Sequence, residues 1–119
     1  MKLPYRNNCF VPKEKLTKYL LNPRHARGKD KARFFTRMGF NEEEYELLEK
    51  ELISLARKNE VMKIRDSESQ MKYDIKGIIK TPTGREVSIT TVWAIDRGKR
   101  KPRFITAYPL ERKKFGKSV

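Results

Sequence analysis

The chain has 119 residues, close to the commonest size of a single domain and too short for two separate cores. Its 29 Lys and Arg residues against 15 acidic ones give a net charge of +14, which predicts a polyanionic partner. No run of 18 apolar residues occurs and the N-terminus lacks the apolar core of a secretion signal, so we expect a cytoplasmic protein without a membrane span. A single cysteine excludes an internal disulfide, and together with one histidine it argues against a zinc site, so no metal or cofactor is predicted.

Two short helices are predicted near the N-terminus. The first covers residues 12–22, because a proline is tolerated in its first turn and Pro23 ends it. The second covers residues 31–38, with Asp30 as its N-terminal cap and Gly39 at its end.

A third helix is predicted from a regular apolar pattern. Residues 41–44 have the sequence N-x-x-E, which resembles a capping box at a helix start. Apolar residues then recur at spacings of three and four, at Tyr45, Leu48, Leu52 and Leu55. We expect this helix to end near Asn59. Residues 41–70 carry nine acidic and five basic side chains, so this part of the chain is either ordinary solvated surface or kept off a binding face.

Four strands are predicted after residue 60, where the apolar period changes from 3.6 to 2. They cover residues 61–65, 71–80, 85–95 and 103–109. Short turns join the last three strands, so neighbouring strands should pair antiparallel. Strict alternation in the last strand would separate Phe104, Thr106 and Tyr108 from Arg103, Ile105 and Ala107.

This order of elements predicts an α+β fold. About three N-terminal helices would pack on one face of a four-stranded antiparallel β-sheet, and the other face would be free to bind. Residues 1–110 would form one domain, and residues 111–119 a basic, mobile tail. RNA suits such a face, because Lys and Arg bind phosphates and aromatic rings stack on bases. Duplex DNA suits it less well, since no helix has the pattern of an exposed basic recognition helix.

Several residues have the chemistry for cleaving RNA without a metal. The reaction needs a base for the 2′-hydroxyl, cations around the phosphate and a proton donor for the leaving 5′-oxygen. Histidine suits both proton roles near neutral pH, and His25 lies in a loop rich in cations. The alternative is that His25 and Lys31 are ordinary surface residues. Similarly, Arg103 could pair with Glu86 across the sheet, and Trp93 could belong to the core.

Three segments together resemble a known family: YLLNPRHARGKDKARFF, TVWAI and PRFITAYP. Over about residues 10–110 the chain resembles small bacterial toxin domains of the barnase/EndoU/colicin/RelE (BECR-fold) RNase superfamily, which occur in polymorphic toxins and toxin–antitoxin systems. The resemblance implies a metal-independent endoribonuclease that leaves 2′,3′-cyclic phosphate ends on cellular RNA. It also implies an antitoxin or immunity protein, which we expect to be acidic. Because the chain starts at Met1, a stand-alone toxin of such a pair is expected.

The resemblance also implies roles for individual residues. His25 would be the general base or acid, Lys31 and Arg103 phosphate ligands, and Thr106 and Tyr108 groups that orient the scissile phosphate. The remaining candidates for RNA contact are Arg24, Thr91 and Trp93. Two alternatives stay open: a non-catalytic basic RNA-binding or regulatory module, and a module that binds only a protein partner.

Overall fold

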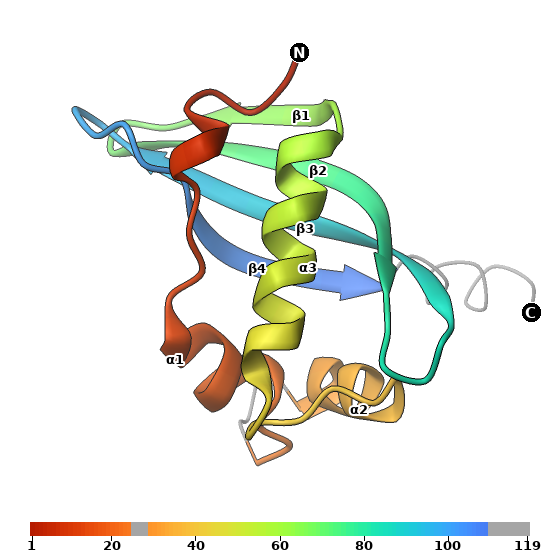
Figure 1. Ribbon diagram of the computed structural model, residues 1–119. Helices are drawn as coiled ribbons and strands as arrows, with labels where there is room; N and C mark the ends of the chain where they lie inside the picture. The colour runs from red at the N-terminus through yellow and green to blue at the C-terminus, as the bar shows by residue number, and fades with distance from the viewer. Residues whose placement is uncertain (25–28, 110–119) are drawn as a thin grey trace, which may run out of the picture.

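The computed structural model describes residues 1–24 and 29–109, and it confirms the predicted α+β fold (Figure 1). Its helical elements are η1 (Arg6–Asn8), α1 (Lys13–Lys15), η2 (Leu16–Leu20), α2 (Lys29–Arg37) and α3 (Tyr45–Lys58). Its strands are β1 (Val61–Asp66), β2 (Gln70–Lys80), β3 (Glu86–Asp96) and β4 (Arg103–Pro109). Within these residues, no helix is long and apolar enough to cross a membrane.

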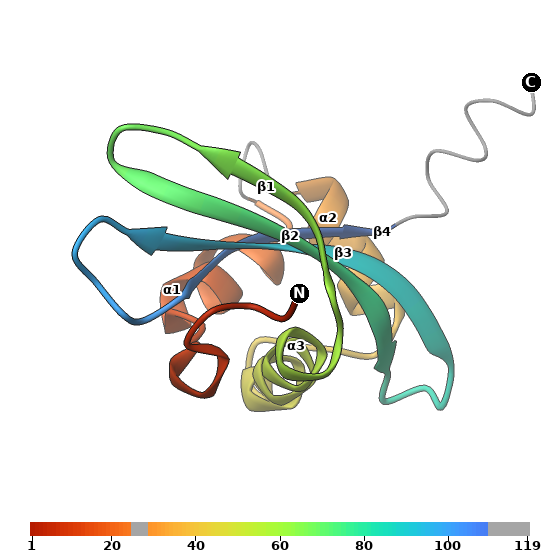
Figure 2. The same ribbon diagram turned by 90° about the horizontal axis from the view of Figure 1, so that it is seen from above.

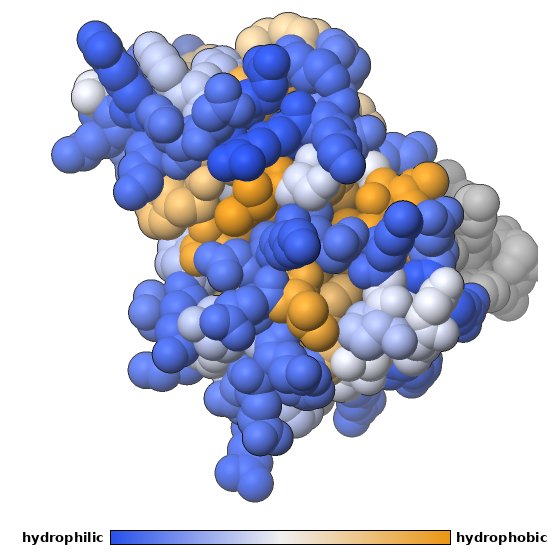
Figure 3. Space-filling model, viewed as in Figure 1, coloured by the Kyte–Doolittle hydropathy of each residue, from blue (hydrophilic) through white to orange (hydrophobic). Residues whose placement is uncertain are grey.

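The four strands form one antiparallel sheet in the order β1-β2-β3-β4. Helix α3 crosses one side of this sheet, while α2 lies beside β4 at the edge (Figure 2). We call the side under α3 the helix face and the opposite side the open face. Ile75 and Trp93 point to the helix face, whereas Asp74 and Val92 point to the open face. Hydrophilic side chains cover most of the outer surface on the helix side (Figure 3).

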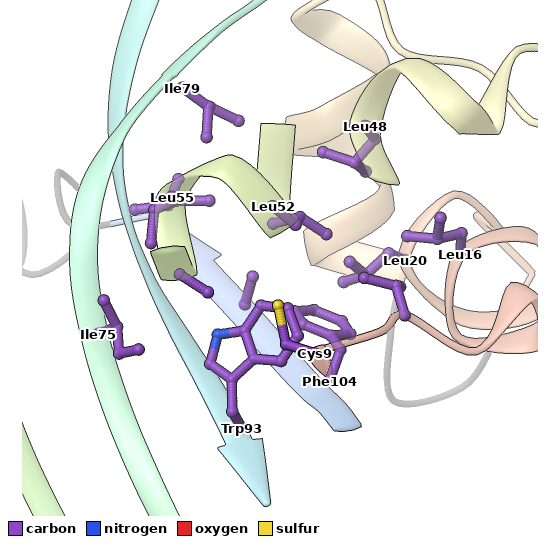
Figure 4. Close-up of a cluster of buried hydrophobic side chains, with 14 of the residues drawn as sticks. Cys9, Leu16, Leu20, Leu48, Leu52, Leu55, Ile75, Ile79, Trp93 and Phe104 are labelled. Atoms are coloured by element: carbon purple, nitrogen blue, oxygen red, sulfur yellow. The ribbon is translucent and has the colours of Figure 1, made fainter. Parts of the chain in front are cut away.

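The hydrophobic core lies between α3 and the helix face (Figure 4). Leu48, Leu52 and Leu55 form the buried stripe of α3, as their spacing predicts. On the sheet, the rings of Trp93 and Phe104 meet edge to face, with their centroids 5.4 Å apart. The N-terminal segment completes the core with Cys9, Leu16 and Leu20.

The ends of α2 and α3 agree with some of the predicted boundary signals. The predicted capping box at Asn41 was wrong, because α3 begins at Tyr45 and its N-cap, Glu44, makes no side-chain cap hydrogen bond. The side chain of Asn41 instead accepts a hydrogen bond from the Glu44 backbone N–H at 2.8 Å, within the turn that precedes the helix. At the end of α2, Gly39 adopts φ 101°, and Phe40 N–H donates to the Phe35 carbonyl at 3.1 Å, as in a Schellman motif. The prediction for Asp30 was wrong, because α2 begins one residue earlier and Asp30 lies inside its first turn.

The first predicted helix is not a continuous α-helix. One α-helical turn, α1, is followed by the π-helical turn η2, in which Leu21 N–H donates to the Leu16 carbonyl at 2.8 Å. This five-residue spacing changes the direction of the side chains that follow. Leu16 and Leu20 are fully buried, and Tyr19 lies partly exposed at the edge of the core.

A bulge in β4 corrects the predicted faces of the last strand. Thr106 pairs with Val92, but the next pair is Phe104 with Trp93, so Ile105 is an extra residue. Phe104 therefore turns to the helix face, where it is fully buried. Thr106 stays on the open face. Tyr108 and Arg103 lie on the same face, because they pair with Thr90 and Ala94.

Candidate active site

Three polar side chains from three separate elements meet at the β4 edge of the sheet. The Lys31 ammonium donates hydrogen bonds to Tyr19 Oη and to Thr106 Oγ1, each at 2.8 Å. The two hydroxyl oxygens lie 3.2 Å apart, within hydrogen-bond distance of each other. All three side chains are partly buried. We call Tyr19, Lys31 and Thr106 the Lys31 cluster.

Local backbone features bring the Lys31 cluster together. The π-helical turn η2 carries Tyr19, and Thr106 lies on the open face of β4 next to the bulge at Ile105. Lys31 lies in the first turn of α2, where the helix dipole is positive. A lysine there adds its charge to that of the helix end, so this corner of the molecule favours an anion.

The electrostatic surroundings of Tyr19 favour its phenolate. Burial raises the pKa of Tyr19, but its hydrogen bonds with Lys31 and Thr106 and the charges of Lys31 and Lys15 outweigh it, so the pKa lies below the ordinary value. The two ammonium groups also lie over the ring, with Lys15 Nζ 5.4 Å and Lys31 Nζ 5.3 Å from its centroid. Tyr19 is thus placed among cations.

Tyr108 has the opposite surroundings on the open face. Burial raises the pKa of Tyr108, and the Asp74 carboxylate raises it further, against a smaller lowering by Arg65. Arg65 and Asp74 form an ion pair across β1 and β2, and the carboxylate is nearly buried. Tyr108 therefore keeps its proton more firmly than an exposed tyrosine would.

Arg103 lies away from the Lys31 cluster, at the start of β4. Its guanidinium donates to both oxygens of the Asp96 carboxylate at 3.2 Å and to Gln70 Oε1 at 3.2 Å. The hydrogen bond from Arg103 lowers the pKa of Asp96, outweighing its slight desolvation. The alternative pairing with Glu86 is wrong, because Glu86 lies opposite Lys80 at the other end of the hairpin.

Thr91 and Trp93 belong to the core, contrary to their prediction as RNA contacts. Both are fully buried on the helix face. Trp93 Nε1 donates to Thr91 Oγ1 at 2.8 Å, and Thr91 Oγ1 donates to the Ile75 carbonyl at 2.9 Å. Since α3 covers this face, neither side chain can reach RNA, and we leave both out of the candidate site.

Two predicted residues, Arg24 and His25, fall between η2 and α2 in the sequence. Arg24 is exposed, and its backbone N–H donates to Asn22 Oδ1 at 2.9 Å, which forms a local turn. His25 lies outside the described residues, as does the predicted basic tail 111–119. In the described part of the chain, no three His, Cys, Asp or Glu side chains gather as a metal site would need.

Tyr19 is the residue of this site that the sequence interpretation missed. Its ring packs against the core beside the buried Leu16 and Leu20, but its hydroxyl reaches beyond the core to Lys31 and Thr106. The available signal was chemical: a tyrosine in an aliphatic stripe needs a partner for its hydroxyl.

Comparison with known proteins places this fold in a family. The model of the family described as Domain of unknown function (DUF6883) matches residues 2–111. The chain belongs to the DUF6883 family. The DUF6883 fold is also similar to a chain of the contact-dependent growth inhibition toxin–immunity protein complex from Klebsiella pneumoniae 342, with a TM-score of 0.66 and 16% sequence identity. This similarity covers 88% of the DUF6883 chain and 96% of the other chain. No curated protein gives a significant sequence match.

Proposed function

We propose that this DUF6883 domain is a metal-independent endoribonuclease toxin that acts in the bacterial cytoplasm and is restrained by an acidic antitoxin or immunity protein. It would cleave cellular RNA through attack of a 2′-hydroxyl on the adjacent phosphate. The observation that carries this proposal is the Lys31 cluster, in which an ammonium at a helix start holds two hydroxyl groups from distant parts of the chain.

The Lys31 cluster has the chemistry that a phosphodiester requires. The ammonium and the start of α2 would attract the non-bridging oxygens of the phosphate, and Thr106 would orient them. Tyr108 lies two residues further along the same face of β4, where it would help to position the nucleotide. His25, which is six residues before Lys31 in the sequence, would act as the general base or acid.

The open face supplies further positive charge for an RNA strand. Lys63, Lys72 and Lys76 lie on this face according to the strand register. Arg24 is exposed and would contact the RNA backbone. Arg103 is partly exposed, but its guanidinium already binds the Asp96 carboxylate. An RNA phosphate would have to displace this carboxylate, so we assign Arg103 a peripheral role in RNA binding.

A toxin role and a protein partner are supported by two independent features. The structurally similar chain comes from a complex of a growth inhibition toxin with its immunity protein. The net charge of +14 would attract an acidic partner as well as RNA, and the partner would then compete with RNA for the same surface.

The test is cleavage of total bacterial RNA and tRNA by the purified chain in EDTA. His25→Ala and Lys31→Ala should each abolish cleavage while the fold is kept, whereas Lys50→Ala, an exposed lysine of α3, should cut as the wild type does. Cutting by both site variants at the wild-type rate would contradict the residue assignment. Intact RNA that the folded protein retains in a salt-sensitive way would instead support a non-catalytic binding module.

A further inference from the structure

The two tyrosines at this site lie in opposite electrostatic environments. Tyr19 lies beside the ammonium groups of Lys31 and Lys15, and Tyr108 lies near the carboxylate of Asp74. When two titratable groups of one site are driven in opposite directions, their proton roles usually differ. Tyr19 is the one whose surroundings ease the loss of a proton.

We infer that Tyr19 is the general acid of RNA cleavage, the residue that protonates the leaving 5′-oxygen. The inference rests on the proposed endoribonuclease function. It adds a catalytic residue to that function, and it assigns the general acid and the general base to two different residues.

The hydrogen bonds of Tyr19 leave its phenolic hydrogen directed away from Lys31. An ammonium group can only donate, so Tyr19 Oη accepts from Lys31 Nζ at 2.8 Å and its own hydrogen must point to another acceptor. Thr106 Oγ1, at 3.2 Å, lies in the direction of the open face of β4. A phosphodiester held by Lys31 and Thr106 would bring its leaving oxygen to the same place.

The charges around Tyr19 stabilise the phenolate that proton donation leaves behind. Among the residues that the structure describes, Lys31 from α2 and Lys15 from α1 place positive charge beside it, and its neighbour on β4, Thr106, is neutral. Their combined effect lowers the pKa of Tyr19 despite its burial. In this role Tyr19 starts the reaction as the neutral phenol and ends it as the phenolate.

The proposed step balances in protons and bonds. A general base takes the proton of the 2′-hydroxyl, and the 2′-oxygen forms a bond to phosphorus. The bond from phosphorus to the 5′-oxygen breaks, and that oxygen takes the proton of Tyr19 Oη. The products are a 2′,3′-cyclic phosphate and a 5′-hydroxyl. Solvent then returns a proton to Tyr19 and removes one from the base.

The test compares two RNA oligonucleotides that differ in one atom at the cleaved linkage. One has the natural 5′-oxygen, and the other has a bridging 5′-sulfur, a leaving group that needs no protonation. Tyr19→Phe should lower the rate on the oxygen substrate by about 10²–10⁴-fold, the usual contribution of a general acid, and the rate on the sulfur substrate by less than about tenfold. Tyr45→Phe is the matched control, because its ring also lies under a lysine, with Lys13 Nζ 5.2 Å from the centroid.

The wild type provides a second readout that does not depend on a variant. Its rate on the oxygen substrate should fall at alkaline pH as Tyr19 loses its proton, and this fall should be absent with the sulfur substrate. A fall of the same size with the sulfur substrate would not come from a proton given to the leaving oxygen, and it would contradict the inference.

The possible results separate the inference from the function on which it rests. Equal losses on both substrates would mean that Tyr19 only positions Lys31, and this would overturn the inference. Cutting by Tyr19→Phe at the wild-type rate would also overturn it, while the endoribonuclease proposal would stand. Failure of the wild type to cut either substrate would overturn both.

Discussion

Gly77 in β2 tests how α3 is held on the sheet. A Cβ at this position would lie 2.7 Å from Leu55 Cγ and 2.7 Å from Asn59 Nδ2, which is closer than real Cβ atoms approach their neighbours. Leu55 is 2% exposed and cannot turn aside. The Asn59 side chain donates to the Leu55 carbonyl at 2.9 Å at the end of α3. Gly77→Ala must therefore move the C-terminal end of α3.

The magnitude follows from three contributions. Overpacking of a filled core costs about 1–3 kcal/mol. Disturbing the Asn59 hydrogen bond costs about 1 kcal/mol, and alanine recovers roughly 0.5–1 kcal/mol relative to glycine within a strand. We expect Gly77→Ala to lower the free energy of unfolding by about 1–3 kcal/mol, a large part of the roughly 5–15 kcal/mol typical of a domain.

The assay is urea unfolding followed by circular dichroism, with the slope against urea unchanged. Lys76→Ala, at the neighbouring exposed position of the open face, is the control and should change the free energy of unfolding by less than about 0.5 kcal/mol. A Gly77→Ala protein as stable as the wild type would refute the close packing of α3 on β2.

Three further predictions concern a turn and two charges. Asn41→Ala removes the hydrogen bond that holds the turn before α3 and should lower the free energy of unfolding by about 1 kcal/mol in urea; no change would mean that this bond does not stabilise the fold. Arg103 lowers the pKa of Asp96 in the folded protein, so the ion pair stabilises the fold at pH values above the pKa that Asp96 has in the unfolded chain. The stabilisation is lost as the pH falls through the lowered pKa of the folded state. Arg103→Gln should thus reduce the melting temperature at neutral pH but not at a pH below both values, and an equal loss at both would argue against the ion pair. Lys31→Met should raise the pKa of Tyr19, because the raising effect of burial remains while the lowering effect of Lys31 is removed. Phenolate absorbance against pH measures this pKa. An unchanged pKa would mean that Lys31 does not lie beside the ring.

Local patterns were enough to predict most elements of the fold. The apolar stripe of α3 and the alternation in β2 and β3 are set by neighbours within a few residues, so the sequence carries them directly. Gly77 also contains information about the faces, since a glycine within a strand often marks the close approach of another element. Gly77 pairs with Ile89 in the structure, so alternation along β3 places Thr91 and Trp93 on the same face, toward α3.

Non-local geometry explains what the sequence interpretation missed. The bulge at Ile105 contains no glycine, so the sequence gives no signal for it. It places Phe104 on the face opposite to the predicted one. The π-helical turn at Leu16–Leu20 gives no sequence signal distinct from that of an α-helix. Tyr19 and Thr106 are 87 residues apart, and only the docking of η2 and α2 against β4 brings them to Lys31. Lys31 and Thr106 were each predicted as site residues without their contact, which, like the place of Tyr19, depends on the three-dimensional arrangement.

The measurement that tests the central claim most directly is analysis of the RNA ends made by the wild-type protein in EDTA. Mass spectrometry of an oligonucleotide that contains the cleaved linkage would identify both new ends. Our account predicts a 2′,3′-cyclic phosphate on one fragment and a 5′-hydroxyl on the other, both absent with Lys31→Ala. A 5′-phosphate product, or intact RNA from a folded protein, would contradict it.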